Sequence, residues 1–383
     1  MVTGAKNGVM LRDLHGLAYD DPKWKELLDQ LTHSDMAKLA NYGAFLTESI
    51  ISIGKNLTND SDGPVGFVNF MPGLSEHYKG NPSFACEIVI ASTFNKDLAY
   101  RMGQIVGETG LYGDEGGNGL PYTGWYAPAV NIHRSPFSGR NYEYYSEDPV
   151  LSGKMAVNVI NGAGSKGVYT DLKHFAVNDQ ETNRQGVATY LTEQSLREIY
   201  LKPFELAVKG SDDPAFSVKA TEDIKAGRIN GYKGSTGMMS SFNRIGTRWT
   251  GGDYRLLTTI LRNEWGFEGV VISDYITVGS LMPAKQAIYA GNDLILTSTS
   301  PERWNNSSES NPEDMYVLRK AAHNILYAVA NSNSVNAEVL GYKMELWLIA
   351  LIVVDCVAVA GISVWGYFAV RKALKKAEQQ ASE

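Results

Sequence analysis

The sequence predicts an α/β fold, a (β/α)8 barrel of the TIM type, followed by a single C-terminal transmembrane helix. Two observations predict the barrel: short apolar runs alternate with amphipathic helical patterns, and the alternation continues over about 300 residues, the size of such a barrel. One long apolar stretch near the C-terminus predicts the membrane helix. A doubly wound parallel sheet is the alternative, but no GxGxxG motif follows an early strand.

The composition is that of a globular protein. The 383 residues carry a net charge of −7, and 44% of them are apolar and 20% charged. These values exclude wholesale disorder and fibrous repeats, and the acidic balance argues against a nucleic-acid partner. Two cysteines, Cys86 and Cys356, are too few for a disulfide framework or a Cys-rich zinc site. No HExxH or paired-His spacing is present, so we expect neither a metal nor another cofactor.

The predicted strands are short apolar runs, which are typical of strands buried on both faces of a parallel sheet. Between them lie helical patterns, and Asp253 is the expected N-cap of one of these helices. The acidic segment before Pro149 is typical of a cap for a further helix. We expect strands at 65–70, 87–92, 125–130, 168–175, 236–242, 269–274 and 292–297, and helices at 97–112, 192–209, 253–265 and 313–330.

Two polar stretches, 211–236 and 298–312, interrupt the alternation and are expected to be loops. The first lengthens one loop of the barrel, and we expect it to shape the outer part of a binding site. Deleting it should then change the preference for the leaving group of a substrate, and an unchanged preference would contradict this expectation.

The stretch Leu346–Val370 has 25 residues and a single charge, Asp355. As a helix it would be roughly 37 Å long, more than the ~30 Å hydrocarbon core of a bilayer. Tryptophan and tyrosine lie near its ends, as in interfacial anchors, and a basic segment follows it. The alternative is a buried core helix. The residues concerned are Trp347, Trp365, Tyr367, Arg371, Lys372, Lys375 and Lys376.

The basic segment sets the expected topology. By the positive-inside rule residues 371–383 are a cytoplasmic tail, 345–370 span the membrane, 331–344 are a linker, and the barrel of residues 1–330 is extracytoplasmic. The N-terminus shows no apolar signal region, so we expect the chain to be the C-terminal part of a longer protein. Asp355 costs roughly 2.5–3.5 kcal/mol at mid-membrane and is expected to pair with another helix.

Polar side chains gather at the expected carboxyl ends of the strands, where barrel active sites lie. Lys173 and His174 end one strand, Asp274 ends another, and Asp62 and Arg140 lie in adjoining loops. Carboxylate acceptors beside cationic donors suit an uncharged, polyhydroxylated substrate, because each hydroxyl both donates and accepts. Other interpretations stay open: Asp274 as a helix N-cap, and Lys173 with His174 as a solvated or purely structural pair.

Taken together, these segments resemble the barrel domain of glycoside hydrolase family 3, the β-glucosidase group. The resemblance covers about residues 20–297, with its motifs in order. The opening GLAYDDPKWKELLDQLT is similar to the lead-in of members in which the barrel follows the other domains. The matching motifs are SDGP at 61–64, APAVNIHRSPFSGRNYEYYSEDP at 127–149, KHFAVNDQETNR at 173–184, LREIYLKPFE at 196–205 and LRNEWGFEGVVISD at 261–274.

The resemblance implies a retaining glycosidase. Asp274 matches the nucleophile, which would form a covalent glycosyl-enzyme that water then hydrolyses. Cations near Asp274 are expected to favour its ionised form. Asp62 matches the carboxylate that grips sugar hydroxyls, and Arg184 matches an arginine near the nucleophile. Further hydroxyl ligands would be Arg140, Lys173 and His174.

The chain departs from the family where the general acid is concerned. A retaining enzyme needs a second carboxyl about 5–5.5 Å from the nucleophile, which most members carry on a separate domain that this chain lacks. Single-domain members instead use an Asp-His pair on the loop after Lys-His, but here that loop has only Asp179 and Glu181, with no histidine. Phe242 and Tyr275 also stand where the family often has Tyr and Trp.

Three functional hypotheses follow. The first is a membrane-anchored, retaining exo-β-glycosidase acting on β-glucosides or oligosaccharides, with the acid supplied by an N-terminal or separate domain. The second is a catalytically impaired, sugar-binding or sensing barrel. The third ignores the resemblance: Lys173 could form a Schiff base, as in an aldolase.

Overall fold

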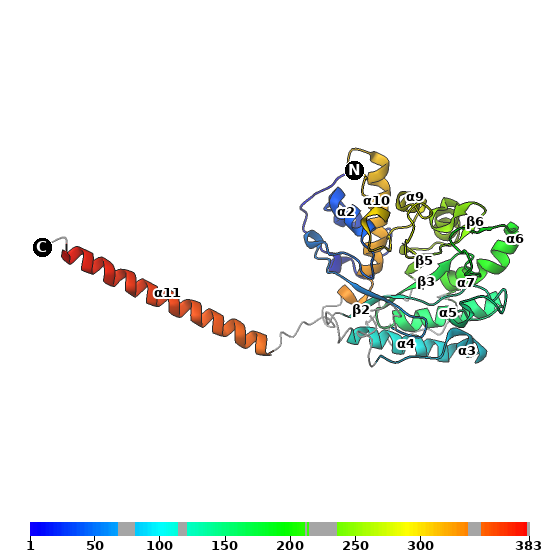
Figure 1. The fold of residues 1–383 in the computed structure, drawn as a ribbon, viewed down its shortest axis with the longest axis horizontal. Helices are drawn as coiled ribbons and strands as arrows, with labels where there is room; N and C mark the ends of the chain where they lie inside the picture. Colours follow the sequence, from blue (N-terminus) through cyan, green and yellow to red (C-terminus); the bar gives the residue numbers. More distant parts are fainter. Residues whose placement is uncertain (68–80, 114–120, 211–212, 214–235, 336–345, 381–383) are drawn as a thin grey trace. The chain divides into compact units, whose positions relative to one another are not determined.

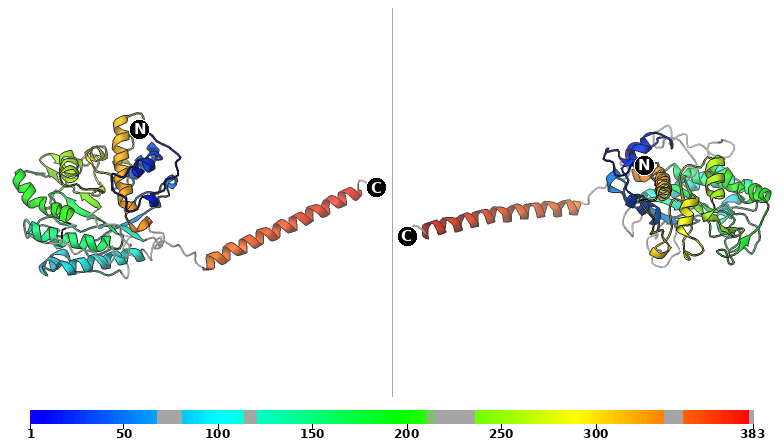
Figure 2. Two further views of the ribbon diagram at one scale, coloured as in Figure 1. Left: turned by 180° about the vertical axis from the view of Figure 1, so that it is seen from behind. Right: turned by 90° about the horizontal axis from the view of Figure 1, so that it is seen from above.

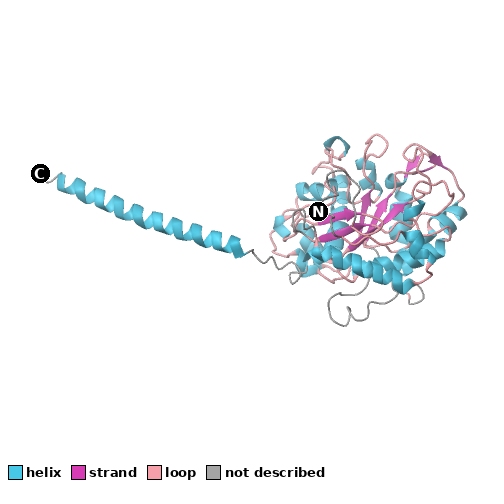
Figure 3. Ribbon diagram, turned by 60° about the horizontal axis from the view of Figure 1, so that its bottom comes forward, coloured by secondary structure: helices cyan, strands magenta, loops and turns pink. Residues whose placement is uncertain are grey.

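The computed structural model describes residues 1–67, 81–113, 121–210, 213, 236–335 and 346–380. The chain divides into two compact units, Met1–Val339 and Leu340–Glu383. The first unit is an α/β domain with a parallel sheet at its centre and helices around it (Figure 3). The second is a single long helix.

The central sheet has five parallel strands among the described residues. In sheet order they are β1 (Asn59–Asp62), β2 (Tyr122–Tyr126), β3 (Tyr169–Phe175), β5 (Gly237–Ser240) and β8 (Val270–Ser273). A single parallel bridge between Ile272 and Leu294 continues the sheet beyond β8. All strands are parallel, so their carboxyl ends meet at one edge, as in the barrel that the sequence predicts.

Helices surround the sheet and precede or follow each strand (Figure 1). Helix α4 packs against α5, and α10 lies against the N-terminal helices, as the rear view in Figure 2 also shows. A small second sheet joins β4 (Ala188–Thr189), β6 (Arg244–Ile245) and β7 (Arg248–Trp249). The α-helices of this unit are α1 (Lys23–Asp29), α2 (His33–Asn41), α3 (Glu87–Ser92), α4 (Lys96–Tyr112), α5 (Pro149–Gly164), α6 (Glu193–Ser195), α7 (Lys202–Lys209), α9 (Ala284–Ala290) and α10 (Pro312–Ala330).

The helix starts follow from local chemistry. Asp148 caps α5 by accepting hydrogen bonds from the N–H groups of Val150 and Leu151, with Pro149 in the first turn. Glycines then let α4 and α5 touch backbone to backbone, since a Cβ on Gly103 would lie 2.1 Å from the carbonyl oxygen of Val159. Two apolar cores result, one between these helices and the sheet and one beneath α10.

Most predicted elements are confirmed. Strands at 168–175, 236–242 and 269–274 appear as β3, β5 and β8, and the strand predicted at 125–130 begins earlier, as β2. Helices at 97–112 and 313–330 are α4 and α10, and the one at 192–209 is α6, a π-helical turn (Leu196–Tyr200) and α7. The helix at 253–265 is a π-helix, Arg255–Glu264. Asp253 Oδ1 accepts the N–H of Arg255 at its start.

Of the other three predicted strands, one is a helix and two do not form named strands in the residues described. Residues 87–92 form the helix α3, whose buried residues Glu87, Ile90 and Ala91 follow helical spacing. Residues 65–67 are a turn, and 68–70 lie outside the described residues. Residues 292–297 contribute only the bridge at Leu294. The loop predicted at 211–236 also lies outside the described residues, apart from Asp213 and Thr236.

The predicted linker begins later than expected. Asn333 donates one hydrogen bond from its N–H to the Gly167 carbonyl and another from Nδ2 to the Tyr122 carbonyl. The barrel unit therefore extends past Ala330, and the rest of the predicted linker lies outside the described residues.

The second unit is α11 (Leu346–Gln380), a helix of 35 residues. Its segment Val353–Lys372 has a mean hydropathy of 1.8 and none of that segment is buried within the structure. By length and composition it meets the requirement for crossing a membrane.

Candidate active site

One pocket of about 400 Å³ opens at the carboxyl ends of the strands. Asp62 ends β1, Lys173 and His174 lie near the end of β3, and Asp274 directly follows β8. The pocket brings together all the site residues that the sequence predicts: Asp62, Arg140, Lys173, His174, Arg184 and Asp274.

Asp274 has one anchored and one unpartnered oxygen. Its Oδ1 accepts the N–H of Tyr275 at 2.7 Å, whereas Oδ2 is buried and has no hydrogen-bond partner among the described residues. Burial raises the pKa of Asp274 to about 6, although the guanidinium groups of Arg140 and Arg184 oppose this shift. The cations thus act as the sequence predicts, but desolvation outweighs them. At neutral pH the carboxylate is still mainly ionised, and Oδ2 has no hydrogen-bond partner among the described residues.

His174 is the neighbour of that oxygen. Its Nε2 lies 3.9 Å from Asp274 Oδ2. Burial, with Arg140 and Lys173 nearby, lowers the pKa of the imidazole well below its usual value, so the ring is neutral. Asn131 fixes the backbone of His174 through two hydrogen bonds, one to its N–H and one to its carbonyl oxygen.

Asp62 and Lys173, which both line the pocket, form an ion pair. Lys173 Nζ lies 2.8 Å from Asp62 Oδ1, and the lysine side chain is 2% exposed. Burial lowers the pKa of Lys173, but Asp62 and Glu143 together raise it above the usual value. Schiff-base chemistry needs a neutral amine, which a depressed pKa would supply. The structure therefore argues against the aldolase hypothesis.

Glu143 is a functional candidate that the sequence argument missed. It lies in a short 3-10 turn (Asn141–Glu143) directly after Arg140. The Arg140 Nε donates a hydrogen bond to Glu143 Oε1, and Lys173 Nζ lies 3.8 Å from Glu143 Oε2. The available signal was the carboxyl three residues after Arg140, a spacing that lets the two pair in a turn.

Arg184 is held by two neighbours. Its Nη1 donates to Glu181 Oε2 at 2.7 Å, and its guanidinium lies 4.1 Å from the centre of the Phe242 ring. Phe242 thus orients Arg184 by a cation–π contact. Tyr275 also lines the pocket, and its hydroxyl lies 2.5 Å from the Ser298 hydroxyl.

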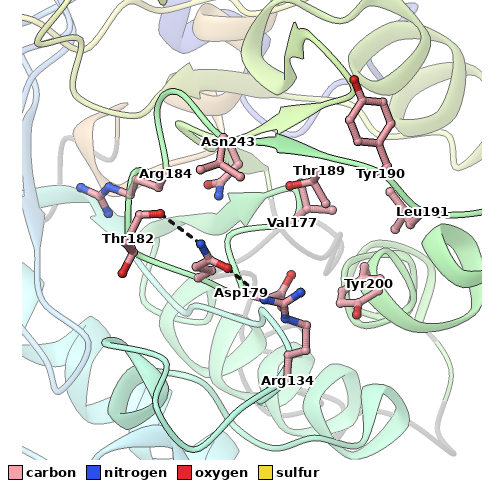
Figure 4. A pocket seen from close by; sticks show the side chains of 12 residues that line it. Arg134, Val177, Asp179, Thr182, Arg184, Thr189, Tyr190, Leu191, Tyr200 and Asn243 are labelled. Carbon is pink, nitrogen blue, oxygen red and sulfur yellow. Dashed lines mark hydrogen bonds between the residues drawn. The ribbon is translucent and has the colours of Figure 1, made fainter.

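Neither carboxyl of the 178–186 loop is a free acid beside Asp274. Glu181 lines the pocket but is paired with Arg184 and lies 3.9 Å from Arg140. Asp179 lines a second pocket of about 90 Å³, shown in Figure 4, with Arg184 as a shared wall. That volume holds a few water molecules. Asp179 Oδ1 accepts the N–H of Ile132 at 2.6 Å, and burial raises its pKa to about 7.

No group of three His, Cys, Asp or Glu side chains in the described part of the chain has the geometry of a metal site. The side chains that line the pocket include carboxylates, guanidinium groups, an ammonium, a neutral imidazole and tyrosine hydroxyls.

Comparison of this sequence with known proteins shows which family it matches. The profile of the glycosyl hydrolase family 3 N terminal domain matches residues 68–325. The beta-glucosidase A of Butyrivibrio fibrisolvens is 36% identical over 259 residues, which is 68% of this chain and 26% of that protein. A beta-glucosidase of Rhizobium radiobacter is 36% identical over 287 residues, 74% of this chain and 30% of that one. The chain thus spans less than a third of the length of these relatives.

Solved structures agree with the sequence comparison. The beta-glucosidase 3B of Thermotoga neapolitana, solved with glucose, superposes with a TM-score of 0.65 and 32% identity over 86% of this chain and 46% of that one. A beta-glucosidase from Bifidobacterium adolescentis gives a TM-score of 0.66 at 27% identity, covering 83% of this chain and 41% of that one.

Proposed function

Because the chain belongs to glycosyl hydrolase family 3, we propose that its pocket binds the terminal sugar of a β-glucoside or β-linked oligosaccharide and cleaves it with retention. The observation that carries the proposal is the Asp274 carboxylate, which belongs to the pocket lining and whose Oδ2 is buried and unpartnered among the described residues. A nucleophile needs such a free, ionised oxygen.

In the proposed reaction, Asp274 Oδ2 attacks the anomeric carbon while the bond to the leaving oxygen breaks and that oxygen takes a proton from an acid. Water then attacks the glycosyl ester, loses a proton to the same group, and releases both the sugar and the carboxylate. Asp62 accepts hydrogen bonds from sugar hydroxyls, and Arg140 and Lys173 donate to hydroxyl oxygens. The neutral His174 can donate or accept without adding charge.

The acid must come from outside the described pocket. Asp62 and Glu181 are each held in an ion pair with Lys173 or Arg184, and Asp179 lines the other pocket. We propose that the acid lies on a domain N-terminal to this barrel or on a separate chain. The greater length of the relatives supports this.

A second candidate function is a sugar-binding or sensing barrel that does not turn over substrate. This function is favoured because each of the other carboxylates that line the described pocket is paired with a cation. Sugar binding needs hydroxyl ligands but no acid.

Intact mass after incubation with 2,4-dinitrophenyl 2-deoxy-2-fluoro-β-glucoside tests the two functions. The leaving group needs little acid help, so the reaction depends on the nucleophile. We expect one fluoroglycosyl adduct on Asp274 and none in Asp274→Asn. Glucose binding without an adduct would favour the sensing barrel, and neither adduct nor binding would refute both.

We further propose that α11 anchors the barrel in a membrane as a single-pass protein, with the barrel extracytoplasmic and the C-terminus cytoplasmic. The apolar segment Val353–Lys372 and the positive charges of Arg371 and Lys372 support this. Resistance to carbonate extraction, and protease protection of the C-terminal tail alone, would be the expected results. Asp355→Leu tests helix pairing: if assembly is unchanged, Asp355 has no partner in the membrane.

A further inference from the structure

Two buried glutamates lie behind the wall of the pocket, and neither is among the residues that line it. Glu143 and Glu87 are each 1% exposed. Glu87 belongs to α3, which packs against the 3-10 turn that carries Glu143. The comparison with known proteins assigns the chain to a family, but it assigns no role to Glu87 or Glu143.

Glu143 contacts two side chains that do line the pocket. Its Oε1 accepts a hydrogen bond from Arg140 Nε, and its Oε2 lies 3.8 Å from Lys173 Nζ. The other partner of Lys173 is Asp62, which lines the pocket as well. One carboxylate therefore sets the position of two cations that come from different elements, a loop and strand β3.

Glu87 differs from Glu143 in its contacts. Both of its carboxyl oxygens are buried and have no hydrogen-bond partner among the described residues. The groups whose charges it feels are Glu143, Lys173 and the Cys86 thiol. Burial, and then the charge of Glu143, raise the pKa of Glu87 well above its usual value. A second negative charge here would compete with Glu143 for Lys173, so the arrangement requires a neutral acid.

We propose that Glu143 is a positioning residue for the sugar subsite, holding Arg140 and Lys173 at the pocket wall, and that Glu87, buried beside it without a hydrogen-bond partner among the described residues, does not share this role. This rests on the proposed sugar-binding function. Arginine and lysine side chains are long and flexible, so fixing them before the ligand arrives removes an ordering cost from binding.

Three isosteric or conservative variants of the full chain in detergent micelles separate the roles. Glu143→Gln removes the charge, Glu143→Asp keeps it on a shorter stem, and Glu87→Gln keeps a neutral group in place. Glu198→Gln, on an exposed helix away from the pocket, is the matched control. Each is measured for glucose affinity by calorimetry and for the Lys173 pKa by NMR of [ε-13C]lysine.

We expect Glu143→Gln to weaken glucose binding by about 10- to 100-fold, as when a charged group loses a buried charged partner. The Lys173 pKa should fall, because Glu143 helps to raise it. Glu143→Asp should recover part of both properties. Glu87→Gln and Glu198→Gln should match the parent within about twofold, well below the tenfold step of a 1.4 kcal/mol change.

An unchanged Lys173 pKa in both Glu143 variants would overturn the proposal, whatever the sugar affinity. A loss in Glu87→Gln as large as that in Glu143→Gln would overturn the claim that Glu87 does not share this role. If the parent chain binds no glucose, the proposed function fails, but the lysine titration still decides whether Glu143 positions Lys173. If Glu143→Gln does not fold, Glu143→Asp carries the same two measurements.

Discussion

The imidazole Nε2 of His174 lies 3.9 Å from Oδ2 of Asp274, and the ring is neutral. The histidine can therefore donate a hydrogen bond toward the carboxylate or a sugar hydroxyl, but it cannot supply a positive charge. The burial that raises the pKa of Asp274 is thus opposed by the two arginines, the backbone N–H of Tyr275 and Lys173, but not by a charge on His174. Asp274 therefore ionises in the pH range in which a histidine would normally titrate, whereas His174 stays neutral there.

The first prediction concerns pH. Since the pKa of Asp274 is raised to about 6, and only the carboxylate attacks, the rate of labelling by the fluoroglucoside should be half its plateau near pH 6 and fall at lower pH. His174→Asn should lower the plateau but keep this limb. A midpoint near pH 4, or a limb that disappears in His174→Asn, would contradict the assignment. Stopped-flow release of dinitrophenolate measures the rate.

A second prediction concerns the pair of Asp62 and Lys173. Asp62→Asn and Lys173→Met should each weaken glucose binding by about 10- to 100-fold, because each removes the nearest opposite charge of the other residue. The double variant should lose less than the sum, with a coupling energy of about 1–3 kcal/mol. Calorimetry on the four proteins gives this value, and strict additivity would mean that the ion pair does not couple the two side chains in binding.

The contact between Phe242 and Arg184 gives a third prediction. Phe242→Leu removes the ring under the guanidinium and should slow labelling of Asp274 by about 2- to 30-fold, the range of a cation–π contact of ~0.5–2 kcal/mol. Phe242→Tyr keeps the ring and should label at nearly the parent rate. Phe267→Leu is the matched control, since its ring lies 5.6 Å from Arg262 and does not line the pocket. Equal rates in Phe242→Leu and the parent would exclude a role for the ring.

Asp179 gives a prediction on stability. Burial raises its pKa to about 7, against about 3.9 for an unfolded aspartate. A raised pKa stabilises the fold below the unfolded value, and that contribution is lost as the pH rises through about 7. Asp179→Asn should therefore raise the free energy of unfolding by about 2–4 kcal/mol at pH 8 and change it little at pH 4.

Calorimetric unfolding at the two pH values checks this, with Asp20→Asn, an exposed carboxyl, as control. Destabilisation of Asp179→Asn at pH 8 would mean that its charge serves the fold. The amide can still accept the Ile132 N–H bond, so loss of that contact does not confuse the result.

The sequence predicts the longer helices and four of the strands, but it misses strand β1 and misassigns one short apolar run. Strand β1 has the sequence NDSD, yet Asp60 and Ser61 are buried, so hydrophobicity gives no sign of it. The run EIVIAS is equally apolar as a strand or as one helical face, and six residues are too few to separate periods of 2.0 and 3.6. These residues form the helix α3, in which Ile90, Ala91 and Glu87 lie together on the buried face.

The site follows a similar rule. The predicted residues meet in one pocket because each lies at the carboxyl end of a strand or in the loop after it, which motif and topology together determine. Glu143 was missed in the sequence analysis because its role depends on contacts with both Arg140 and Lys173, which belong to two different elements. The raised pKa of Asp274 could not be predicted either, since it depends on depth of burial, which outweighs the nearby cations.

The ion pairs around the pocket also fix its charge during the proposed reaction. Among the described residues at the site, Asp62, Glu143, Glu181 and Asp274 face Arg140, Lys173 and Arg184. The resting site therefore carries one excess negative charge, which stabilises positive charge developing at an anomeric carbon. Esterification of Asp274 removes this excess and leaves the surroundings electroneutral. A uronic acid or sugar phosphate would instead add negative charge to this space, so we expect such ligands to bind more weakly than the neutral sugar.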